Sequence, residues 1–128
     1  DCLNMWVNND SLFFINKNGI LTVHGSNDRK QLGIAQVGPI NTTSEHPLHN
    51  NIELISQTMN GSHCFILKNN TLYVSGWNSY KQAGINTNDD IIETPTIVNY
   101  VFGSILKQIK CGYAHSLFLT DNGHVYGC

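Results

Sequence analysis

Two histidines with the same local surroundings are the first residues in this sequence that could do chemistry. His63 and His115 are 52 residues apart, and each stands between a turn and an apolar run typical of a β-strand. An imidazole can act as a general base or bind a metal. Repeats share their architecture, however, whereas a catalytic site normally occurs once. We therefore expect both histidines to be hydrogen-bonding residues that tie structural layers together.

A second pair, His46 and His49, lies beside Glu45 in a polar stretch. A structural zinc site needs four ligands at closed spacing, and no third or fourth ligand is evident near this pair. We interpret both as solvated loop histidines.

Other catalytic patterns are also missing from the sequence. It contains no phosphate-binding loop, no nucleophile elbow and no credible pair of catalytic carboxylates. Asp89, Asp90 and Asp121 are typical of turns. We expect no catalytic residue, no cofactor, no metal and no small-molecule substrate.

The histidines must be positioned by a repeated hairpin. In residues 61–84, apolar runs at 64–67 and 72–74 flank four polar residues, a pattern that predicts two strands joined by a hairpin turn and followed by a glycine-bounded loop. Residues 11–33 show the same pattern, and residues 115–128 begin it again.

The copies follow a nearly constant period. Gly25 and Gly76 are 51 residues apart, as are Gly33 and Gly84. A fixed period near fifty with short strands and glycine turns predicts β-propeller blades. The single domain 1–128 divides into copies at about 1–51, 52–103 and 104–128, the last of them truncated.

Each copy offers three clear strands and a weak fourth. Leu3, Met5 and Val7 alternate with polar residues, which predicts a half-buried strand. Residues 96–98, directly after Pro95, predict an edge strand. The positions that recur between copies and define the repeat are Gly25, Asn27, Gln31, Gly33, His63, Gly76, Asn78, Gln82, Gly84, Gly112, His115 and Gly123.

Composition narrows the class of protein. Charged residues are 12% of the chain and the net charge is -2, which does not support binding to nucleic acid or chromatin through bulk electrostatics. No apolar run reaches membrane-spanning length. The four cysteines lack metal-binding spacing, which favours a reduced, intracellular protein of the cytoplasm or nucleus. Because the chain begins without Met and stops inside a repeat, we expect it to be a fragment.

Residues 111–127 carry a family resemblance. Gly112-Tyr-Ala-His115-Ser, the Asp-Asn-Gly123 turn and the strand after it resemble the repeat of the regulator of chromosome condensation family. That repeat continues with Gly-x-Asn and Gly-Gln-Leu-Gly, which residues 25–33 and 76–84 follow closely. The resemblance spans nearly the whole chain in about two and a half copies.

Two departures fall in the loops. Lys30 and Lys81 replace the glycine that precedes Gln in the family pattern. If that turn requires positive φ, a lysine there costs on the order of 1 kcal/mol. Asn8 and Ser11 stand where the family has Gly and His.

The resemblance implies an all-β, seven-bladed propeller, of which this chain supplies two to three four-stranded blades. Because too few blades are present to close a ring, we expect an open arc. We also expect the loops to project at one rim, where aromatic and basic residues would anchor a protein partner. The alternative is that Trp77 and Tyr80 pack between adjacent blades, because an aromatic side chain buries a large area. The candidate residues are Asp28, Arg29, Lys30, Trp77, Tyr80 and Lys81.

The function we predict is a non-enzymatic, regulatory protein-interaction module. The resemblance implies two alternatives: a guanine nucleotide exchange factor for a Ran-type small GTPase, or a substrate-recognition part of a ubiquitin ligase or a kinase-associated regulatory domain. The repeats alone do not separate these roles.

Overall fold

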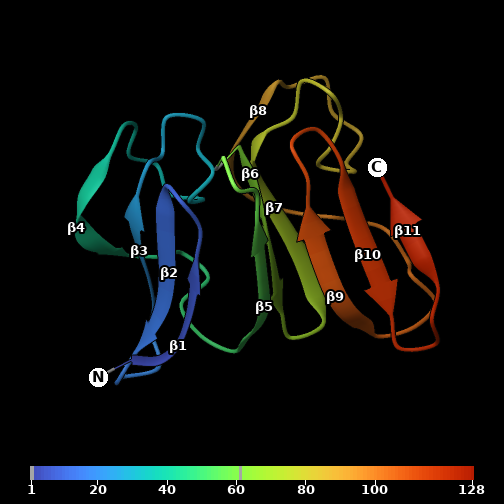
Figure 1. Ribbon diagram of the computed structural model, residues 1–128, viewed down its shortest axis with the longest axis horizontal. Coiled ribbons are helices and arrows are strands. Elements are labelled where there is room, and N and C mark those ends of the chain that lie inside the picture. The colour runs from blue at the N-terminus through green and yellow to red at the C-terminus, as the bar shows by residue number, and fades with distance from the viewer. Residues whose placement is uncertain (1, 61) are drawn as a thin grey trace.

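Three antiparallel β-sheets lie side by side in an arc, with the two chain ends on opposite flanks (Figure 1). The computed structural model describes residues 2–60 and 62–128; Gly61, where the repeated stretch begins, lies outside them. The first blade contains β1 (Cys2–Val7), β2 (Ser11–Asn16), β3 (Leu21–Gly25) and β4 (Ile40–Glu45). The second contains β5 (Ile52–Gln57), β6 (His63–Lys68), β7 (Thr71–Trp77) and β8 (Ile91–Ile97). The third contains β9 (Leu106–Cys111), β10 (Ser116–Thr120) and β11 (Val125–Gly127).

This architecture confirms the predicted partial propeller. The first two blades have four strands in the orders β1-β2-β3-β4 and β5-β6-β7-β8, and the third has three strands in the order β11-β10-β9. The expected weak fourth strand is therefore present in both complete copies. In residues 2–60 and 62–128, no helix is long and apolar enough to cross a membrane.

Two apolar cores join the blades. One lies between the first and second blades and is built around Phe13, Val23 and Ile66. The other lies between the second and third blades, where the rings of Phe65 and Phe118 meet edge to face with centroids 5.1 Å apart. Five of the six residues of β6 are buried, because this strand faces a core on each side.

The expected half-burial of Leu3, Met5 and Val7 is wrong. These side chains are 68%, 58% and 64% exposed. They lie on the face of the first blade that points away from the second, and no other blade covers that face in the described chain. Trp6, on the opposite face of β1, packs against the first core. Alternation thus identified the strand, but it did not determine how exposed these side chains are.

The edge strand expected at residues 96–98 begins earlier, as β8 at Ile91. β8 pairs with β7 from Ile91 onward, so Pro95 lies inside the strand and not before it, and Val98 lies beyond its end in the second core. Proline is tolerated here because β8 is at the edge of its sheet and pairs only with β7. The N–H that proline lacks is not needed for pairing with a strand on the other side.

Candidate functional site

The loops after β3 and β7 are each held at the base by one buried asparagine. Asn27 Oδ1 accepts the Leu32 N–H at 2.8 Å, and its Nδ2 donates to the Ile34 carbonyl at 3.2 Å. Asn78 Oδ1 likewise accepts the N–H of Ala83, the equivalent of Leu32, at 3.0 Å, and its Nδ2 donates to a carbonyl farther along the loop, that of Asp89, at 3.0 Å. Both side chains are fully buried, so each loop is fixed from inside.

Glycine begins each loop because the backbone there passes very close to the residue that precedes the neighbouring strand. Gly25 and Gly76 have φ values of 118° and 102°. A Cβ at Gly25 would lie 2.3 Å from the Asp10 carbonyl oxygen, and one at Gly76 would lie 2.5 Å from the Ser62 carbonyl oxygen. No side chain fits at either position.

The two glutamines brace the tips of the loops. Gln31 Oε1 accepts the Arg29 N–H at 2.9 Å, and Gln82 Oε1 accepts the Tyr80 N–H at 3.0 Å. Their amide nitrogens differ: Gln31 Nε2 lies 3.3 Å from Ser26 Oγ, whereas Gln82 Nε2 is buried without a hydrogen-bond partner. Trp77 occupies the position of Ser26 in the second loop, so the hydroxyl that would accept this bond is lost.

The lysines that replace glycine adopt the left-handed backbone. Lys30 has φ 59° and Lys81 has φ 62°. Lys30 Nζ donates to the Ala35 carbonyl, and Lys81 Nζ donates to the Thr87 carbonyl at 3.2 Å. Each ammonium group is thus used within its own loop.

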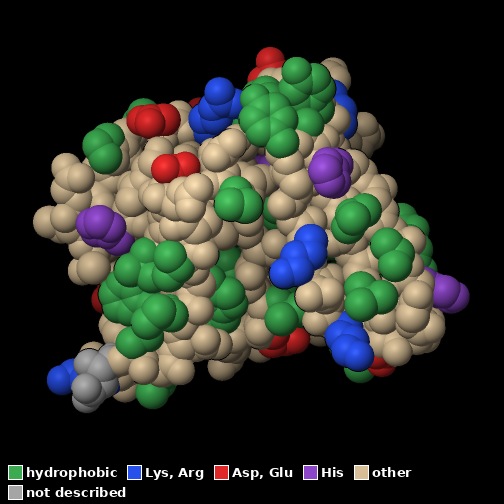
Figure 2. All heavy atoms as spheres, viewed as in Figure 1, with side chains coloured by type: hydrophobic (Ala, Val, Ile, Leu, Met, Phe, Trp, Pro, Cys, Tyr) green, Lys and Arg blue, Asp and Glu red, His purple; other side chains and the backbone are tan. Residues whose placement is uncertain are grey.

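A cluster of aromatic side chains, with a half-buried Trp77 at its centre, spans the rim of all three blades. The Arg29 guanidinium lies 4.6 Å from the centroid of the Trp77 ring. The Tyr80 and Tyr113 rings meet Trp77 edge to face, with centroid distances of 5.2 Å and 5.7 Å. Tyr80 and Tyr113 are 63% and 60% exposed. We call these four residues the aromatic rim; Figure 2 shows hydrophobic side chains beside Lys or Arg at the upper end of the molecule, above the loops of Figure 1.

Three of the six residues predicted from the sequence therefore come together: Arg29, Trp77 and Tyr80. Asp28 is exposed, and its carboxylate accepts the Ser26 hydroxyl at 3.3 Å within its own loop. Sequence reasoning missed Tyr113, which follows Gly112 in the connection before β10. An aromatic residue in that turn was the available signal, but its proximity to Trp77 depends on how the blades are arranged.

His63 ties the second blade to the third. Its Nε2 lies 2.9 Å from Ser116 Oγ, and that hydroxyl donates to the Gln82 carbonyl at 2.8 Å. Because its own proton is used in this bond, the Ser116 hydroxyl can only accept a hydrogen bond from His63, so His63 carries its proton on Nε2. The other ring nitrogen, Nδ1, is buried without a hydrogen-bond partner. Burial, with a smaller contribution from His115, lowers the pKa of His63 to about 4. His63 is a neutral structural residue.

His115 holds the equivalent position in the third blade but is exposed. Its ring packs over Gly112, where a Cβ would lie 2.1 Å from the ring. The two histidines therefore share a position and differ in surroundings.

The interpretation of both loop histidines as solvated is wrong for one of them. His46 is fully buried, lies 6.1 Å from the Phe13 ring between centroids, and accepts the Leu48 N–H at Nδ1. Burial chiefly lowers its pKa to about 4. His49 is exposed. The described residues contain no group of three or more His, Cys, Asp or Glu that could hold a metal.

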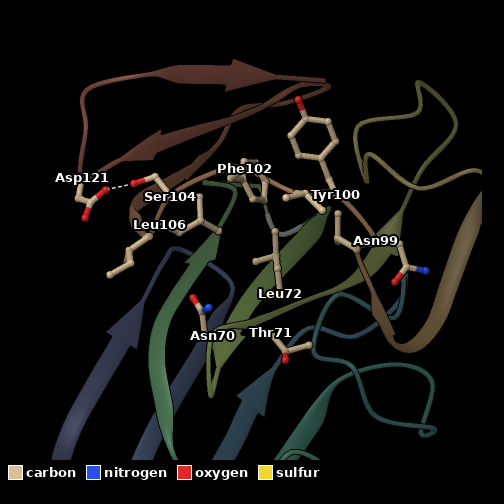
Figure 3. Close-up of a pocket in the computed structure, with 13 residues that line it drawn as sticks. Asn70, Thr71, Leu72, Asn99, Tyr100, Phe102, Ser104, Leu106 and Asp121 are labelled. Atoms are coloured by element: carbon tan, nitrogen blue, oxygen red, sulfur yellow. Dashed lines mark hydrogen bonds between the residues drawn. The ribbon is translucent and has the colours of Figure 1, made fainter.

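A hollow of about 750 Å³ lies at the other end of the second blade, where β7 begins. Figure 3 shows side chains of the β8–β9 connection and of the β6–β7 turn around it, with Ser104 hydrogen-bonded to Asp121. Its lining is mixed: apolar side chains such as Leu72 and Phe102 alternate with polar ones such as Asn70 and Asn99. It brings no set of acid, base and nucleophile together.

Comparison with known proteins shows a repeat match at one end of the chain and a shared fold over all of it. A family model described as "Regulator of chromosome condensation (RCC1) repeat" matches residues 106–128. The crystal structure of Prp20p from Saccharomyces cerevisiae superposes on the whole chain with a TM-score of 0.83 at 21% identity. The fold of the chain is that of this solved structure, and its residues 106–128 match the RCC1 repeat. The chain covers 30% of the Prp20p chain.

Curated proteins similar to this chain have several names. Guanine nucleotide exchange factor SRM1 of Saccharomyces cerevisiae is 24% identical over 124 residues, which is 93% of this chain and 26% of SRM1. Probable E3 ubiquitin-protein ligase HERC3 of Homo sapiens is 37% identical over 54 residues, which is 41% of this chain and 5% of HERC3. The chain thus spans about a quarter or less of these relatives.

Proposed function

We propose that this RCC1-repeat chain is a non-enzymatic, regulatory module that binds a protein partner through the aromatic rim. The observation that carries the proposal is the convergence of Arg29, Trp77, Tyr80 and Tyr113 from the loops of three blades. Exposed Tyr, Trp and Arg side chains are the residues that most often dominate the binding energy of protein interfaces. Two tyrosines more than half exposed supply such anchors.

The loops behind the rim favour binding because they are already ordered. The buried amides of Asn27 and Asn78 fix the loop bases, and Gln31 and Gln82 fix the tips. A partner would then lose little free energy to loop ordering, which otherwise weakens association. Lys30, Lys81 and Asp28 contribute to the loops themselves, and we assign them no direct contact.

We also propose the copy boundaries 1–51, 52–103 and 104–128 and a complete propeller of seven blades. The boundaries are supported by the sheets, since the strands of the blades lie within 2–45, 52–97 and 106–127. The larger propeller is supported by the partial coverage of the longer relatives.

Site-specific photocrosslinking in cells would test the rim. A photoreactive amino acid replaces Tyr80 or Tyr113 in turn, and Tyr100 serves as the matched control because it is 53% exposed at the other end of β7. We expect one protein to be captured at positions 80 and 113 and not at 100, with yield lost in Arg29→Ala. Equal capture at all three positions would contradict the proposal.

Guanine nucleotide exchange on a Ran-type small GTPase is the second candidate function. It is supported by the match to SRM1 over 93% of this chain and by the likeness to Prp20p, whose structure is described together with binding to Gsp1p and histones. The assay is release of a fluorescent guanine nucleotide from a Ran-type GTPase. Acceleration that Tyr80→Ala abolishes would favour exchange, and an unchanged release rate would count against it.

A recognition role within a ubiquitin ligase or a kinase-associated protein is the remaining alternative, and the identity shared with HERC3 supports the first of these. A captured partner whose ubiquitylation depends on the rim would favour it. We place the protein inside the cell, in the cytoplasm or nucleus. Histone binding is named for Prp20p, but a net charge of -2 does not support chromatin docking here.

A further inference from the structure

The hollow of about 750 Å³ lies at the end of the second blade opposite the aromatic rim, and all of its walls are inside the described chain. They come from the β6–β7 turn, from residues 98–106 that lead into β9, and from Asp121 in the β10–β11 turn. Blades before β1 or after β11 would cover sheet faces, whereas this hollow opens at the ends of the strands (Figure 1). It is therefore a feature of the junction between the second and third blades.

The corresponding junction between the first and second blades is filled. Residues 46–51 join β4 to β5, whereas the longer connection 98–105 joins β8 to β9. In the shorter connection, Leu48 packs against the first core and its carbonyl accepts a hydrogen bond from Lys68 Nζ. The residue 52 positions after Lys68 is Thr120, whose hydroxyl donates within its own turn. The longer connection thus lacks both the inserted side chain and the lysine that hold the shorter one.

The backbone of the longer connection is free to pair with a ligand. Residues 98–102 belong to no helix, strand or turn. The Val98 N–H donates to the Leu72 carbonyl, and the Phe102 carbonyl accepts the Tyr126 hydroxyl. Between these two bonds, the N–H and carbonyl groups of residues 99–101 pair with no other described residue. Free main-chain groups of this kind are what proteins use to hold an extended peptide.

Two asparagine amides stand on either side of an apolar floor. Figure 3 shows Leu72 between Asn70 and Asn99, with Phe102 above it. Both asparagines are exposed, and in residues 2–60 and 62–128 neither side-chain amide has a hydrogen-bond partner. An asparagine amide both donates and accepts, which matches the carbonyl and N–H of a peptide unit.

The charge of the hollow is negative. Among the described residues that line it, Asp121 alone is charged, and its carboxylate accepts the Ser104 hydroxyl. Glu53 brings a second carboxylate to the β6–β7 turn, where it accepts the Asn70 N–H at 2.8 Å. Lys107, near the start of β9, is not among the lining residues. A carboxylate beside an apolar floor is complementary to a cation that neighbours an apolar side chain.

The mouth of the hollow is apolar. Val101 is 87% and Ile105 60% exposed, and Val101 is the most exposed large apolar side chain among the described residues. Residues 46–51 of the shorter connection expose no such side chain. Apolar exposure next to a concave site is typical of a binding surface. The volume of about 750 Å³ is also within the range of natural ligand sites, about 300–1,000 Å³.

We propose that this hollow binds a short extended peptide segment of a protein partner, in which an apolar residue is next to Lys or Arg. The apolar side chain lies over Leu72 and Phe102, and the cation lies beside Asp121. The two asparagine amides and the backbone of residues 99–101 pair with the peptide backbone. This second site is separate from the aromatic rim. Because Tyr100 lines the hollow, a photoreactive residue there would meet this peptide and not the partner of the rim.

A library of random hexapeptides displayed on mRNA is the probe, and the immobilised full chain is the receptor. We expect selection to enrich peptides in which an apolar residue is next to Lys or Arg. Enriched peptides are then labelled with fluorescein and titrated by fluorescence anisotropy. Asn99→Ala removes one amide and should raise Kd about fivefold. Asp121→Asn retains an oxygen for Ser104 but removes the charge, and should raise Kd about threefold at low salt and less at high salt.

Two exposed residues outside the hollow provide matched controls. Asn41→Ala in β4 and Asp90→Asn before β8 make the same chemical changes elsewhere on the surface, and both should leave Kd unchanged. Circular dichroism checks that all four variants are folded. Replacing the Lys or Arg of an enriched peptide by Gln should remove the effect of Asp121→Asn, because the cation and the carboxylate form one contact.

Three results would overturn the proposal. The first is a selection that enriches no sequence motif, or one that enriches acidic or wholly polar peptides. The second is enriched peptides that bind Asn99→Ala and Asp121→Asn as tightly as the wild type, which would place their site elsewhere on the chain. The third is self-association of the wild type in sedimentation equilibrium that Asn99→Ala abolishes, since the occupant would then be a second copy.

Discussion

The Arg29 guanidinium carbon lies 4.6 Å from the centroid of the Trp77 ring, so a cation of the first blade rests on an aromatic ring of the second. The two side chains come from equivalent loops 51 residues apart but from different positions within them: Trp77 replaces Ser26, and Tyr80 replaces Arg29. The rim is therefore a contact between successive repeats. It forms only when two blades are folded side by side.

A double-mutant cycle should detect this contact. Arg29→Ala, Trp77→Leu and the double variant are compared by urea unfolding. Because cation–π pairs at exposed sites contribute about 0.5–1 kcal/mol, we expect a coupling free energy of that size. Arg29→Lys is the conservative control and should retain part of it. Strict additivity of the two single substitutions would show that the stacking does not contribute to stability.

Acid should destabilise the fold through two histidines. Burial lowers the pKa values of His46 and His63 to about 4 from 6.5, so between these values the unfolded chain binds more protons than the folded one. The full stabilisation is present above pH 6.5 and is lost as pH falls toward 4. The loss is on the order of 3 kcal/mol for each histidine. Urea unfolding at pH 7.5, 6 and 5 measures it.

The control for this pH dependence is His63→Gln, which keeps an amide N–H able to reach Ser116. The variant should be less stable at pH 7.5 but should lose less stability than the wild type between pH 6.5 and 5, because one proton-binding difference is removed. An identical pH slope would contradict the assignment of His63.

Two glycines with similar φ values should respond differently to alanine. Gly76 has φ 102° and its Cβ would lie 2.5 Å from the Ser62 carbonyl oxygen, whereas Gly123 has φ 87° and open space around it. Gly123→Ala should cost about 1 kcal/mol of unfolding free energy from backbone strain alone. Gly76→Ala should cost about 3 kcal/mol or more, because backbone must also move. Thermal unfolding compares them, and equal losses would contradict the steric argument.

Lys81 should show two opposing effects in the left-handed turn. Lys81→Met keeps the φ strain and removes the bond to the Thr87 carbonyl, so it should destabilise the chain by about 0.5–1 kcal/mol. Lys81→Gly also removes that bond but relieves the strain, so its net effect should be close to zero. Denaturant titration measures both variants. A glycine variant less stable than the methionine variant would contradict this account.

Much of the fold could be predicted because the same pattern of strands, turns and loops occurs more than once in the sequence. Asn27 and Asn78 stand at the same place in two copies, and both brace a loop in the same way. The wrong predictions concern the burial of individual side chains, which depends on contacts with distant parts of the chain. His46 lies in a polar stretch, yet Phe13 and the loop at Gly33 enclose it. Met5 alternates like any half-buried strand residue, but alternation says nothing about which surface covers it.

The candidate site was likewise predicted where it depends on the repeat and missed where it depends on packing between blades. Arg29, Trp77 and Tyr80 were found because they lie on loops that the glycines and asparagines mark in the sequence. Tyr113 was missed because it lies in a different kind of connection and meets Trp77 only through the packing of the second and third blades. The hydrogen bonds that the Lys30 and Lys81 ammonium groups donate to carbonyls of their own loops could not be predicted from the linear pattern either.

In each loop the residue that fixes the base, Asn27 or Asn78, differs from the residues whose side chains are presented at the surface. Because one buried amide carries the base of each loop, the residue before it can be serine in one copy and tryptophan in the next without changing the blade. Duplication followed by drift at these few positions could therefore give each copy its own preference for a ligand surface. A propeller built this way can acquire new specificities one loop at a time, while the scaffold beneath stays under unchanged selection.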